Sequence, residues 1–362
     1  MALKHVEEYR DSEIAKKLIE RIHETSTKDF KVMEVCGTHT MSIFKNGIRD
    51  VLPDTVSLIS GPGCPVCVTA QKDICAFIDI ARMEDTIVAL FGDLMKVPGG
   101  DSTLMLERAN GADVRIVYSA LDSIKIAQEN PDKKVVFLGV GFETTAPTIA
   151  ASIQAASKMG LKNFFVYTAH KLVPPALEVL MNTEGVKIDG FLLPGHVLLI
   201  SGTDEYVPFV EKYKIPTVVG GFEPVDILHA MLMMIQQFEE GKGTLENAYQ
   251  RAVSAEGNVI AKNAMYDVFE TSTAIWRGIG PIPESGLSIN DKYKEFDASI
   301  ALGLDVKEVD EPKGCACGAI LTGLMSPPDC KLFKKVCTPI NPIGPCMVSN
   351  EGTCAAFYKY HV

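Results

Sequence analysis

The chain has 362 residues, of which 47% are hydrophobic, and its formal net charge at pH 7 is −11. This length allows two or three domains with substantial cores, which excludes an intrinsically disordered protein. The acidic balance, without a prominent Lys/Arg cluster, excludes a nucleic-acid partner. No run of about 18 apolar residues occurs, and the N-terminus lacks an apolar signal-peptide region, so no membrane span and a cytoplasmic location are expected. There, ten cysteines indicate metal or redox chemistry rather than a disulfide scaffold.

The first predicted element is a helix over residues 11–24, where apolar side chains recur on one face. Short apolar runs follow it, each ending in glycine, proline or polar residues, as buried strands do. These runs cover residues 31–35, 56–60, 86–91, 114–118, 134–139, 164–167, 190–193 and 215–220. Helical patterns separate most of them, at 69–82, 101–111, 119–129, 146–159 and 173–183. Strands that alternate with helices predict an α/β fold with doubly wound parallel sheets.

The number of strands fits two domains better than one, with a single eight-stranded barrel as the competing architecture. Two strands end in the same Gly-Phe-Glu sequence, which favours two similar halves facing a cleft. Residues 225–275 are predicted to be helical, and 279–286 to be a linker-like break. The predicted division is an N-terminal helix in 1–30, α/β domains over 31–130 and 131–275, and an irregular C-terminal region over 276–362.

Six of the ten cysteines lie in the C-terminal part of the chain, in a proline-rich segment. They are Cys315, Cys317, Cys330, Cys337, Cys346 and Cys354. A structural zinc site usually draws on C-x2-4-C pairs, and this segment contains none. An iron–sulfur cluster needs only thiolates that converge in space, so the irregular spacing favours a cluster. Zinc, disulfides and inert thiols are the alternatives.

Other polar residues follow the strand-like runs. Ligands of open parallel sheets bind beyond the carboxyl ends of the strands, so we expect these side chains to converge in one cleft. The candidates are Cys36, His39, Cys64, Cys67, Asp93, Glu143, His170, His196 and Glu223. The histidines could equally be structural, and the two glutamates could be helix-capping carboxylates.

Cys64 and Cys67 form a C-x-x-C unit that leads into a predicted helix. A helix N-terminus lowers the pKa of a thiol, which suits disulfide exchange or metal binding. Because no second pair lies nearby, we favour a redox role over half of a zinc site. Cys36 and His39 would also fit a nucleophile and a base, but no triad or oxyanion-hole pattern supports hydrolysis. No P-loop or dinucleotide-binding glycine motif occurs.

Six segments together resemble the HypD family of hydrogenase maturation proteins. They are 36–44 (CGTHTMSIF), 61–69 (GPGCPVCVT), 141–148 (GFETTAPT), 193–197 (LPGHV), 221–225 (GFEPV) and 337–354 (CTPINPIGPCMVSNEGTC). The match runs in order over nearly the whole chain. Met41 departs from the pattern, since some members carry a second histidine there, so no metal-binding role is assigned to it.

The resemblance implies a scaffold that helps to build the Fe(CN)2CO unit of [NiFe] hydrogenases. Two similar α/β domains would face a cleft, and Cys36 would hold a transient iron, carrying cyanide and CO, together with a HypC-type partner. A HypE-type partner would deliver cyanide.

The resemblance also implies a [4Fe–4S] cluster in the C-terminal region. Its ligands would be Cys315, Cys330, Cys337 and Cys354. Cys317 and Cys346 would be redox thiols beside the cluster, in an arrangement similar to ferredoxin–thioredoxin reductase. Cys64 and Cys67 would pass electrons onward.

The leading hypothesis is therefore an assembly scaffold with redox-active thiols, rather than a conventional turnover enzyme. The main alternative is a free-standing iron–sulfur disulfide reductase similar to ferredoxin–thioredoxin reductase. A zinc-stabilised binding module is the third. Metal analysis separates zinc from iron, and disulfide reduction without partners would favour the second hypothesis over the first.

Overall fold

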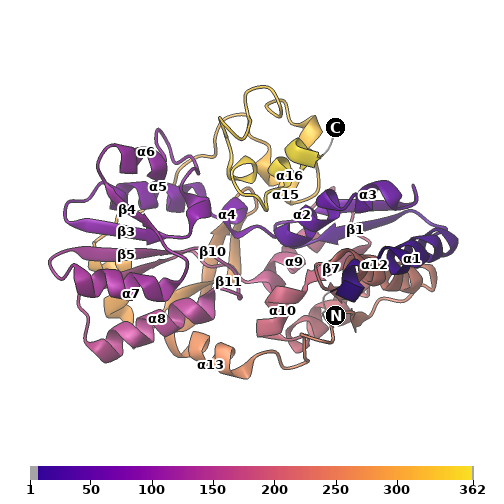
Figure 1. The fold of residues 1–362 in the computed structure, drawn as a ribbon, viewed down its shortest axis with the longest axis horizontal. Helices are drawn as coiled ribbons and strands as arrows, with labels where there is room; N and C mark the ends of the chain where they lie inside the picture. The colour runs from indigo at the N-terminus through magenta and orange to yellow at the C-terminus, as the bar shows by residue number, and fades with distance from the viewer. Residues whose placement is uncertain (1–6, 361–362) are drawn as a thin grey trace.

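A five-stranded parallel sheet occupies one side of the protein in the computed structural model, which describes residues 7–360 (Figure 1). Its strand order is β2–β1–β7–β8–β9. The strands are β1 (Phe30–Glu34), β2 (Val56–Ser60), β7 (Gly190–Pro194), β8 (Thr217–Gly220) and β9 (Leu245–Asn247). In the register, Val32 is paired with Leu58 on one side and with Gly190 on the other.

A four-stranded parallel sheet occupies the other side, in the order β4–β3–β5–β6. Its strands are β3 (Thr86–Leu90), β4 (Asp113–Ile116), β5 (Lys134–Gly139) and β6 (Phe164–Thr168). All five residues of β3 are buried, because helices cover both faces of the sheet. The predicted α/β fold with two doubly wound parallel sheets is confirmed, and the alternative of one eight-stranded barrel is wrong.

Helices connect successive parallel strands, as such crossovers require. The helices before the C-terminal region are α1 (Ser12–Thr25), α2 (Gly37–Lys45), α3 (Ile48–Val51), α4 (Pro65–Val68), α5 (Gln71–Ala81), α6 (Leu104–Ala109), α7 (Ala120–Glu129), α8 (Ala146–Met159), α9 (Val173–Asn182), α10 (Gly195–Ser201), α11 (Val207–Tyr213), α12 (Pro224–Glu239) and α13 (Val259–Val268). Asp11 caps α1 by accepting hydrogen bonds from the backbone of Glu13 and Ile14. Among residues 7–360, no helix combines the length and apolar character needed to cross a bilayer.

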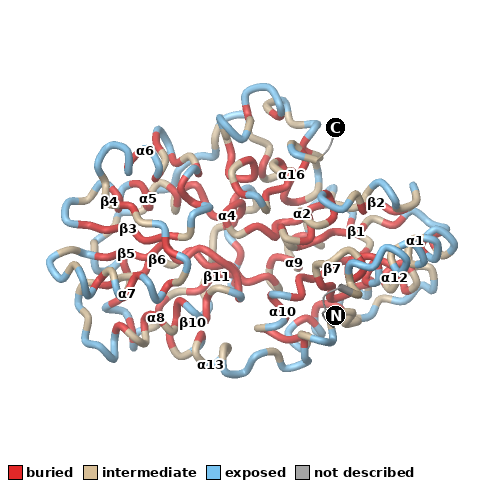
Figure 2. Tube along the Cα trace, in the orientation of Figure 1, coloured by how far each residue is buried: buried red, intermediate tan, exposed pale blue. Residues whose placement is uncertain are grey.

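The side chains of each strand alternate between two apolar cores. In β7, Leu192 points into a core shared with α1 and α12, whereas Phe191 and Leu193 point into a larger core on the opposite face. In β5, Val135 and Phe137 pack with α7 and α8, while the residues between them face the larger core. This larger core extends from one sheet to the other, so the two sheets share packing in the middle of the protein (Figure 2).

The two sheets do not divide the chain at residue 130. Strands β1 and β2 pair with β7–β9, and the four strands between them in sequence, β3–β6, form the second sheet. The predicted boundary between 130 and 131 therefore falls inside the four-stranded sheet. The reason is that β3 pairs with β5 as well as with β4, and β5 continues this sheet beyond residue 130.

The predicted helical segment 225–275 is only partly helical. Helix α12 ends at Glu239, just before Gly241, which has a positive φ of 69° that favours glycine. Strand β9 and helix α13 follow, and the chain then enters β10 (Phe269–Trp276). The expected linker at 279–286 instead belongs to β11 (Gly280–Ile289), which pairs with β10 in a two-stranded antiparallel ribbon. Prolines are tolerated in such a ribbon because both of its strands have a free edge.

Trp276, at the end of β10, lies between the carboxyl ends of the two sheets. Its ring approaches that of Phe142, which follows β5, at 6.1 Å between centroids. Its backbone pairs with Thr69, which follows β2 and α4. Its indole nitrogen donates a hydrogen bond of 2.8 Å to the hydroxyl of Ser285. Trp276, which is 1% exposed, therefore contacts one half of the protein through its ring and the other through its backbone.

The C-terminal region lies over the junction of the two halves (Figure 1). Its few regular elements are α14 (Ala298–Ala301), α15 (Cys317–Leu321), the 3-10 helices η5 (Pro327–Asp329) and η6 (Pro345–Met347), and α16 (Thr353–Tyr360). Helix α16 packs against α2, and η6 packs against α4. The predicted irregular C-terminal region is confirmed, although it begins after the ribbon rather than at residue 276.

Replacing Trp276 with alanine should lower the free energy of unfolding by about 3–5 kcal/mol, because it empties a buried site and leaves Ser285 without its donor. Chemical denaturation followed by circular dichroism measures this loss. Trp276→Phe, which keeps most of the apolar volume, should cost less. Equal effects of the two substitutions would contradict the packing role.

Candidate functional site

Cys36 lies where the strand order of the five-stranded sheet reverses. Strand β1 has β2 on one side and β7 on the other, and ligands of doubly wound sheets bind at such a switch point. Cys36 directly follows β1 and occupies the N-cap of α2. His196 follows β7 and lies in the first turn of α10. Two of the predicted site residues therefore occupy the position where this sheet topology places ligands.

Phe222 joins His39 and His196 in a stack of three rings. Its ring lies 4.4 Å from that of His39 and 3.9 Å from that of His196, with interplanar angles of 23° and 25°. His39 is fully buried, and its Nε2 lies 2.8 Å from the carbonyl oxygen of Gly221. Burial lowers the pKa of His39 to about 4, so this imidazole is neutral at pH 7 and donates from Nε2. His196 is exposed at the other end of the stack.

The C-x-x-C loop lies directly against Cys36. The backbone nitrogen of Gly37 donates a hydrogen bond of 3.1 Å to the carbonyl oxygen of Gly63. A Cβ atom on Gly63 would overlap the backbone nitrogen and Cα of Cys36, so only glycine fits there. Next in sequence, Cys64 and Cys67 form a disulfide with their Cα atoms 5.2 Å apart. The chain thus places a dithiol pair beside the Cys36 backbone.

The C-terminal region contributes a carboxyl group to the same place. Glu351 accepts a hydrogen bond of 2.7 Å from the hydroxyl of Thr38. A Cβ atom on Gly37 would lie 2.6 Å from the carbonyl oxygen of Glu351, so the two backbones are in close contact. Burial raises the pKa of Glu351, and the charge of Asp93 raises it further.

Burial and the charge of Glu351 raise the pKa of Cys36 to about 11. The backbone N–H groups of His39 and Thr38 oppose this effect, as expected at a helix N-terminus, but they do not reverse it. Cys36 is therefore a thiol at neutral pH in the protein alone. A metal ion bound to its sulfur would favour the thiolate, because the positive charge replaces the proton.

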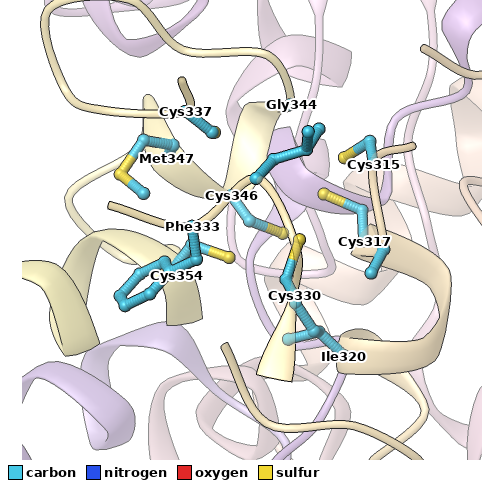
Figure 3. Close-up of a pocket in the computed structure, with 12 residues that line it drawn as sticks. Cys315, Cys317, Ile320, Cys330, Phe333, Cys337, Gly344, Cys346, Met347 and Cys354 are labelled. Carbon is cyan, nitrogen blue, oxygen red and sulfur yellow. The ribbon is translucent and has the colours of Figure 1, made fainter. Parts of the chain in front are cut away.

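The six cysteines of the C-terminal region line one cavity (Figure 3). The cavity is small, with a volume of about 20 Å³ for the centre of a water-sized molecule. Its other lining residues are Ala316, Ile320, Leu332, Phe333, Gly344 and Met347. The lining side chains therefore offer sulfur and hydrocarbon, with no side-chain oxygen or nitrogen. A purely thiol donor set suits an iron–sulfur cluster, and it suits thiophilic metals generally.

Close packing around the thiols supports the same fit. A Cβ atom on Gly344 would lie 2.7 Å from the sulfur of Cys315 and 2.9 Å from that of Cys317. The backbone nitrogen of Ile343 donates to the sulfur of Cys337 at 3.4 Å, and such hydrogen bonds to sulfur tune cluster potentials. Within residues 7–360, no three His, Cys, Asp or Glu side chains are arranged to hold a single metal ion. A cluster instead spreads its thiolates over several irons.

Four of the six thiols of this cavity have raised pKa values. A hydrogen bond with Cys317 and burial raise the pKa of Cys315, and burial raises that of Cys354. Interaction with Cys346 and burial also raise the pKa of Cys317, against an opposite effect of Cys315. Cys346 lies in η6, the element that packs against α4 and its Cys64–Cys67 disulfide.

Arg277 connects the C-x-x-C helix to the C-terminal region. Its Nε donates to the carbonyl oxygen of Thr69 at 2.9 Å, and one guanidinium nitrogen donates to Gln71 at 2.8 Å. The guanidinium also forms an ion pair with Glu311. Because Arg277 is 1% exposed, its guanidinium is a fixed positive charge inside the protein. That charge lowers the pKa values of Cys315 and Cys346 and partly offsets the effects of burial.

Glu143 and His170 lie at the carboxyl edge of the four-stranded sheet instead. Glu143 accepts a hydrogen bond of 2.8 Å from the backbone nitrogen of Val173, and burial raises its pKa to about 7. Its other carboxyl oxygen has no partner among the described residues, and neither has the hydroxyl of the fully buried Tyr206. His170 is also buried, with both ring nitrogens unpartnered in residues 7–360, and burial lowers its pKa to about 3.

Glu223 has a structural role. Both of its carboxylate oxygens accept hydrogen bonds of 2.7 Å from Arg10, and the residue caps α12. The capping alternative for this glutamate is therefore the one that the structure shows. Its backbone neighbour Phe222, rather than Glu223 itself, reaches the rings beside Cys36.

Sequence reasoning missed several residues of the site. Glu351 lies inside the quoted 337–354 motif, but an acidic residue in a cysteine-rich loop gives no signal of what it contacts. Phe222 lies in a Gly-Phe-Glu sequence, where the glutamate rather than the phenylalanine was the predicted site residue. Gly344 and Arg277 become informative only when their neighbours in space are known.

Comparison with known proteins identifies the group to which the chain is similar. A family model named HypD and described as "Hydrogenase formation hypA family" matches residues 13–361. A putative hydrogenase expression/formation protein of Methanocaldococcus jannaschii is 46% identical over 354 residues, covering 97% of this chain and 98% of the relative. Hydrogenase maturation factors HypD of Azotobacter vinelandii and Cupriavidus necator are 44% and 42% identical, each covering 99% of this chain and 97% of the relative.

Glu143→Gln tests the raised pKa of Glu143. Between the ordinary glutamate pKa and about 7, the unfolded chain loses this proton while the folded chain keeps it. The wild-type free energy of unfolding should therefore fall as pH rises through this range, by up to about 1.4 kcal/mol per pH unit. Denaturant unfolding from about pH 4.5 to about pH 8 should show the difference between wild type and variant shrinking or changing sign along this slope. The exposed Glu20→Gln serves as control, and a difference independent of pH would contradict the assignment.

Proposed function

Because this chain belongs to the HypD family of hydrogenase maturation factors, we propose that it is a scaffold for assembling the Fe(CN)2CO unit of [NiFe] hydrogenases. The iron is the cargo of this scaffold and is held at Cys36 together with a HypC-type partner. A HypE-type partner delivers cyanide to it. The cysteine cavity holds a [4Fe–4S] cluster, and the dithiols provide redox support. The thiol chemistry fits the reducing cytoplasm.

One observation carries this proposal: three thiol groups that are far apart in sequence are contiguous in the fold. Cys36 lies against the Gly63 backbone, directly before Cys64. Helix α4, which holds Cys67, packs against η6, which holds Cys346. A chain that served only as a binding module would have no need for this continuity. A scaffold that changes the redox state of bound iron or of its thiols does need it.

The surroundings of Cys36 suit a transiently held iron. A soft thiolate is a suitable ligand for low-spin iron that carries cyanide and CO. In the protein alone the proton stays on sulfur, so iron binding releases it, and the high pKa favours release of the cargo when the proton returns. His39 is neutral and stacked, so it can hydrogen-bond but does not add a positive charge that would repel the metal.

Cys315, Cys330, Cys337 and Cys354 would hold the cluster. The group would supply single electrons to the neighbouring thiols. Cys317 and Cys346 both line the cavity, and Cys346 lies in η6, which packs against α4. This position suits a dithiol that relays electrons to Cys64 and Cys67. Gly344 leaves the space that the sulfurs of Cys315 and Cys317 use.

A second candidate function is disulfide reduction without a scaffold role. The Cys64–Cys67 disulfide next to the cysteine cavity is the observation that favours it. It predicts that the protein reduces an added disulfide substrate in the absence of other maturation proteins. The scaffold proposal predicts no such turnover, so an assay with a small-molecule disulfide and a reductant separates the two.

Cys36→Ala should abolish the infrared stretching bands of cyanide and CO in protein that is purified without oxygen after co-expression with a HypC-type partner. The wild type should show these bands, because Cys36 supplies the thiolate for the iron. Cys75→Ala, which removes a cysteine of α5 outside the site, is the matched control and should keep them. Bands that survive in Cys36→Ala would refute this iron site.

Gly344→Ala should reduce iron retention in the cysteine cavity by about tenfold or more, because the added methyl group displaces the sulfurs of Cys315 and Cys317. Iron analysis and the visible absorbance of the purified protein measure the loss. Gly92→Ala, where a Cβ would meet only Ile116 at 3.6 Å, is the control. Full cluster absorbance in Gly344→Ala, with the fold intact by circular dichroism, would argue against the cavity as the cluster site.

A further inference from the structure

An exposed basic loop covers the outer side of the cysteine cavity. Residues 331–341 contain three lysines, Lys331, Lys334 and Lys335, and no acidic residue, although the whole chain has a net charge of −11. All three lysines are exposed. Lys331 and Lys335 form no ion pair with another residue of the described part of the chain. This loop is therefore a local positive surface on an acidic protein.

The same loop forms the wall of the cavity. Leu332, Phe333 and Cys337 line the cavity, so the residues between the lysines point inward. The Nζ of Lys334 lies 5.9 Å from the ring centre of Phe333, which places charge just outside this wall. The cavity is thus separated from solvent on this side by a single layer of chain. On its other side, η6 packs against α4.

Apolar side chains stand beside the lysines. Ile340 is 96% exposed and Val336 is 51% exposed. Ile340 also borders a groove that encloses about 990 Å³ of open space between the loop and the segment around α6. Lys96, Met105 and Leu106 line the opposite side of this groove, and both apolar residues there are about half exposed. Asp101 also lines that side, where its carboxylate is paired with Arg82 at 3.5 Å.

We propose that residues 331–341 and the adjoining groove are the docking surface for an acidic single-electron carrier protein of the ferredoxin type. The inference rests on the proposed cluster in the cavity behind this surface. Lysines on an acidic protein attract an acidic partner and orient its approach, and the exposed isoleucine and valine supply the small apolar contact of a transient complex. A carrier docked here lies across one layer of chain from the cavity.

The position of this docking surface also gives electrons a route from the carrier to the Cys64–Cys67 disulfide. Each reduced carrier gives one electron and leaves oxidised by one. Two electrons and two protons from solvent convert the Cys64–Cys67 disulfide into two thiols. Electrons enter through the Lys331–Asn341 side of the cavity and leave on the side where Cys346 adjoins α4. The docking surface includes none of Cys36, Cys64 and Cys67, so a docked carrier does not occupy the iron site at Cys36.

The test measures binding of a plant-type [2Fe–2S] ferredoxin to the full chain by calorimetry, with the chain both loaded with iron–sulfur and metal-free. Lys331→Glu/Lys335→Glu should weaken binding by about tenfold or more. Lys17→Glu/Lys158→Glu changes the net charge equally, on α1 and α8, and should leave the affinity within about twofold. Raising the salt from about 0.05 M to about 0.5 M should weaken the wild type and reduce the difference between the two variants.

Ile340→Ser tests the apolar part of the surface and should weaken binding at both salt concentrations. Ile260→Ser, at a residue of α13 that is 84% exposed, is its matched control. Stopped-flow reduction of the loaded protein by ferredoxin should slow in parallel with the loss of affinity. Binding to the metal-free chain reports on the surface alone, so a missing cluster and a missing docking site give different results.

Several results would overturn the proposal. The first is that the wild type does not bind ferredoxin at low salt. The second is that the two double variants lose the same affinity for ferredoxin. The third is that the chain self-associates and Lys331→Glu/Lys335→Glu removes this self-association. Displacement of ferredoxin by a HypC-type partner that itself loses affinity in Lys331→Glu/Lys335→Glu would assign the surface to that partner instead.

Discussion

The site depends on how closely three backbone segments approach one another at Cys36. Gly63 removes the side chain that would separate the C-x-x-C loop from Cys36, and Gly37 does the same for the segment that carries Glu351. Without these two contacts, the dithiol and the carboxyl group would be held away from the switch point of the sheet. Protein interiors are packed closely enough that even one methyl group here must displace backbone. The positions of the thiols therefore follow from backbone contact rather than from side-chain attraction.

Burial then determines the chemical state of these groups. Removing water disfavours every charged form, so Cys36 is a thiol, the pKa values of Cys315 and Cys354 are raised, and His39 and His170 are neutral. Without a bound metal, the neutral forms of these buried groups are therefore favoured. In the proposed iron and cluster sites, a bound metal would supply the positive charge that thiolates require and would offset part of the cost of burying these groups. This links stability to metal loading more directly than in a protein with exposed ligands.

Much of the fold could be predicted from the sequence, because each buried strand is a short apolar run and each crossover helix has its own periodicity. The grouping of strands into sheets could not be predicted, because β1 pairs with β7, which is far away in the sequence. Val32, for example, pairs with Gly190. Helix content in 225–275 was overestimated because α12 ends just before Gly241 and the chain forms β9 before it enters α13. For the site, the motifs marked Cys36, Cys64 and the tail cysteines. Partners such as Glu351 and Phe222 are ordinary residues whose importance comes only from what they touch.

Trp276 is the only tryptophan of the chain, and its position gives the protein an internal optical reporter. Its ring lies between Phe142 and the end of the helix that carries Cys67, and the next residue, Arg277, is hydrogen-bonded to Val68. Disulfides and iron–sulfur clusters quench indole emission at short range. The fluorescence of one native residue can therefore follow the opening of the Cys64–Cys67 bond and the filling of the cysteine cavity in the unlabelled protein.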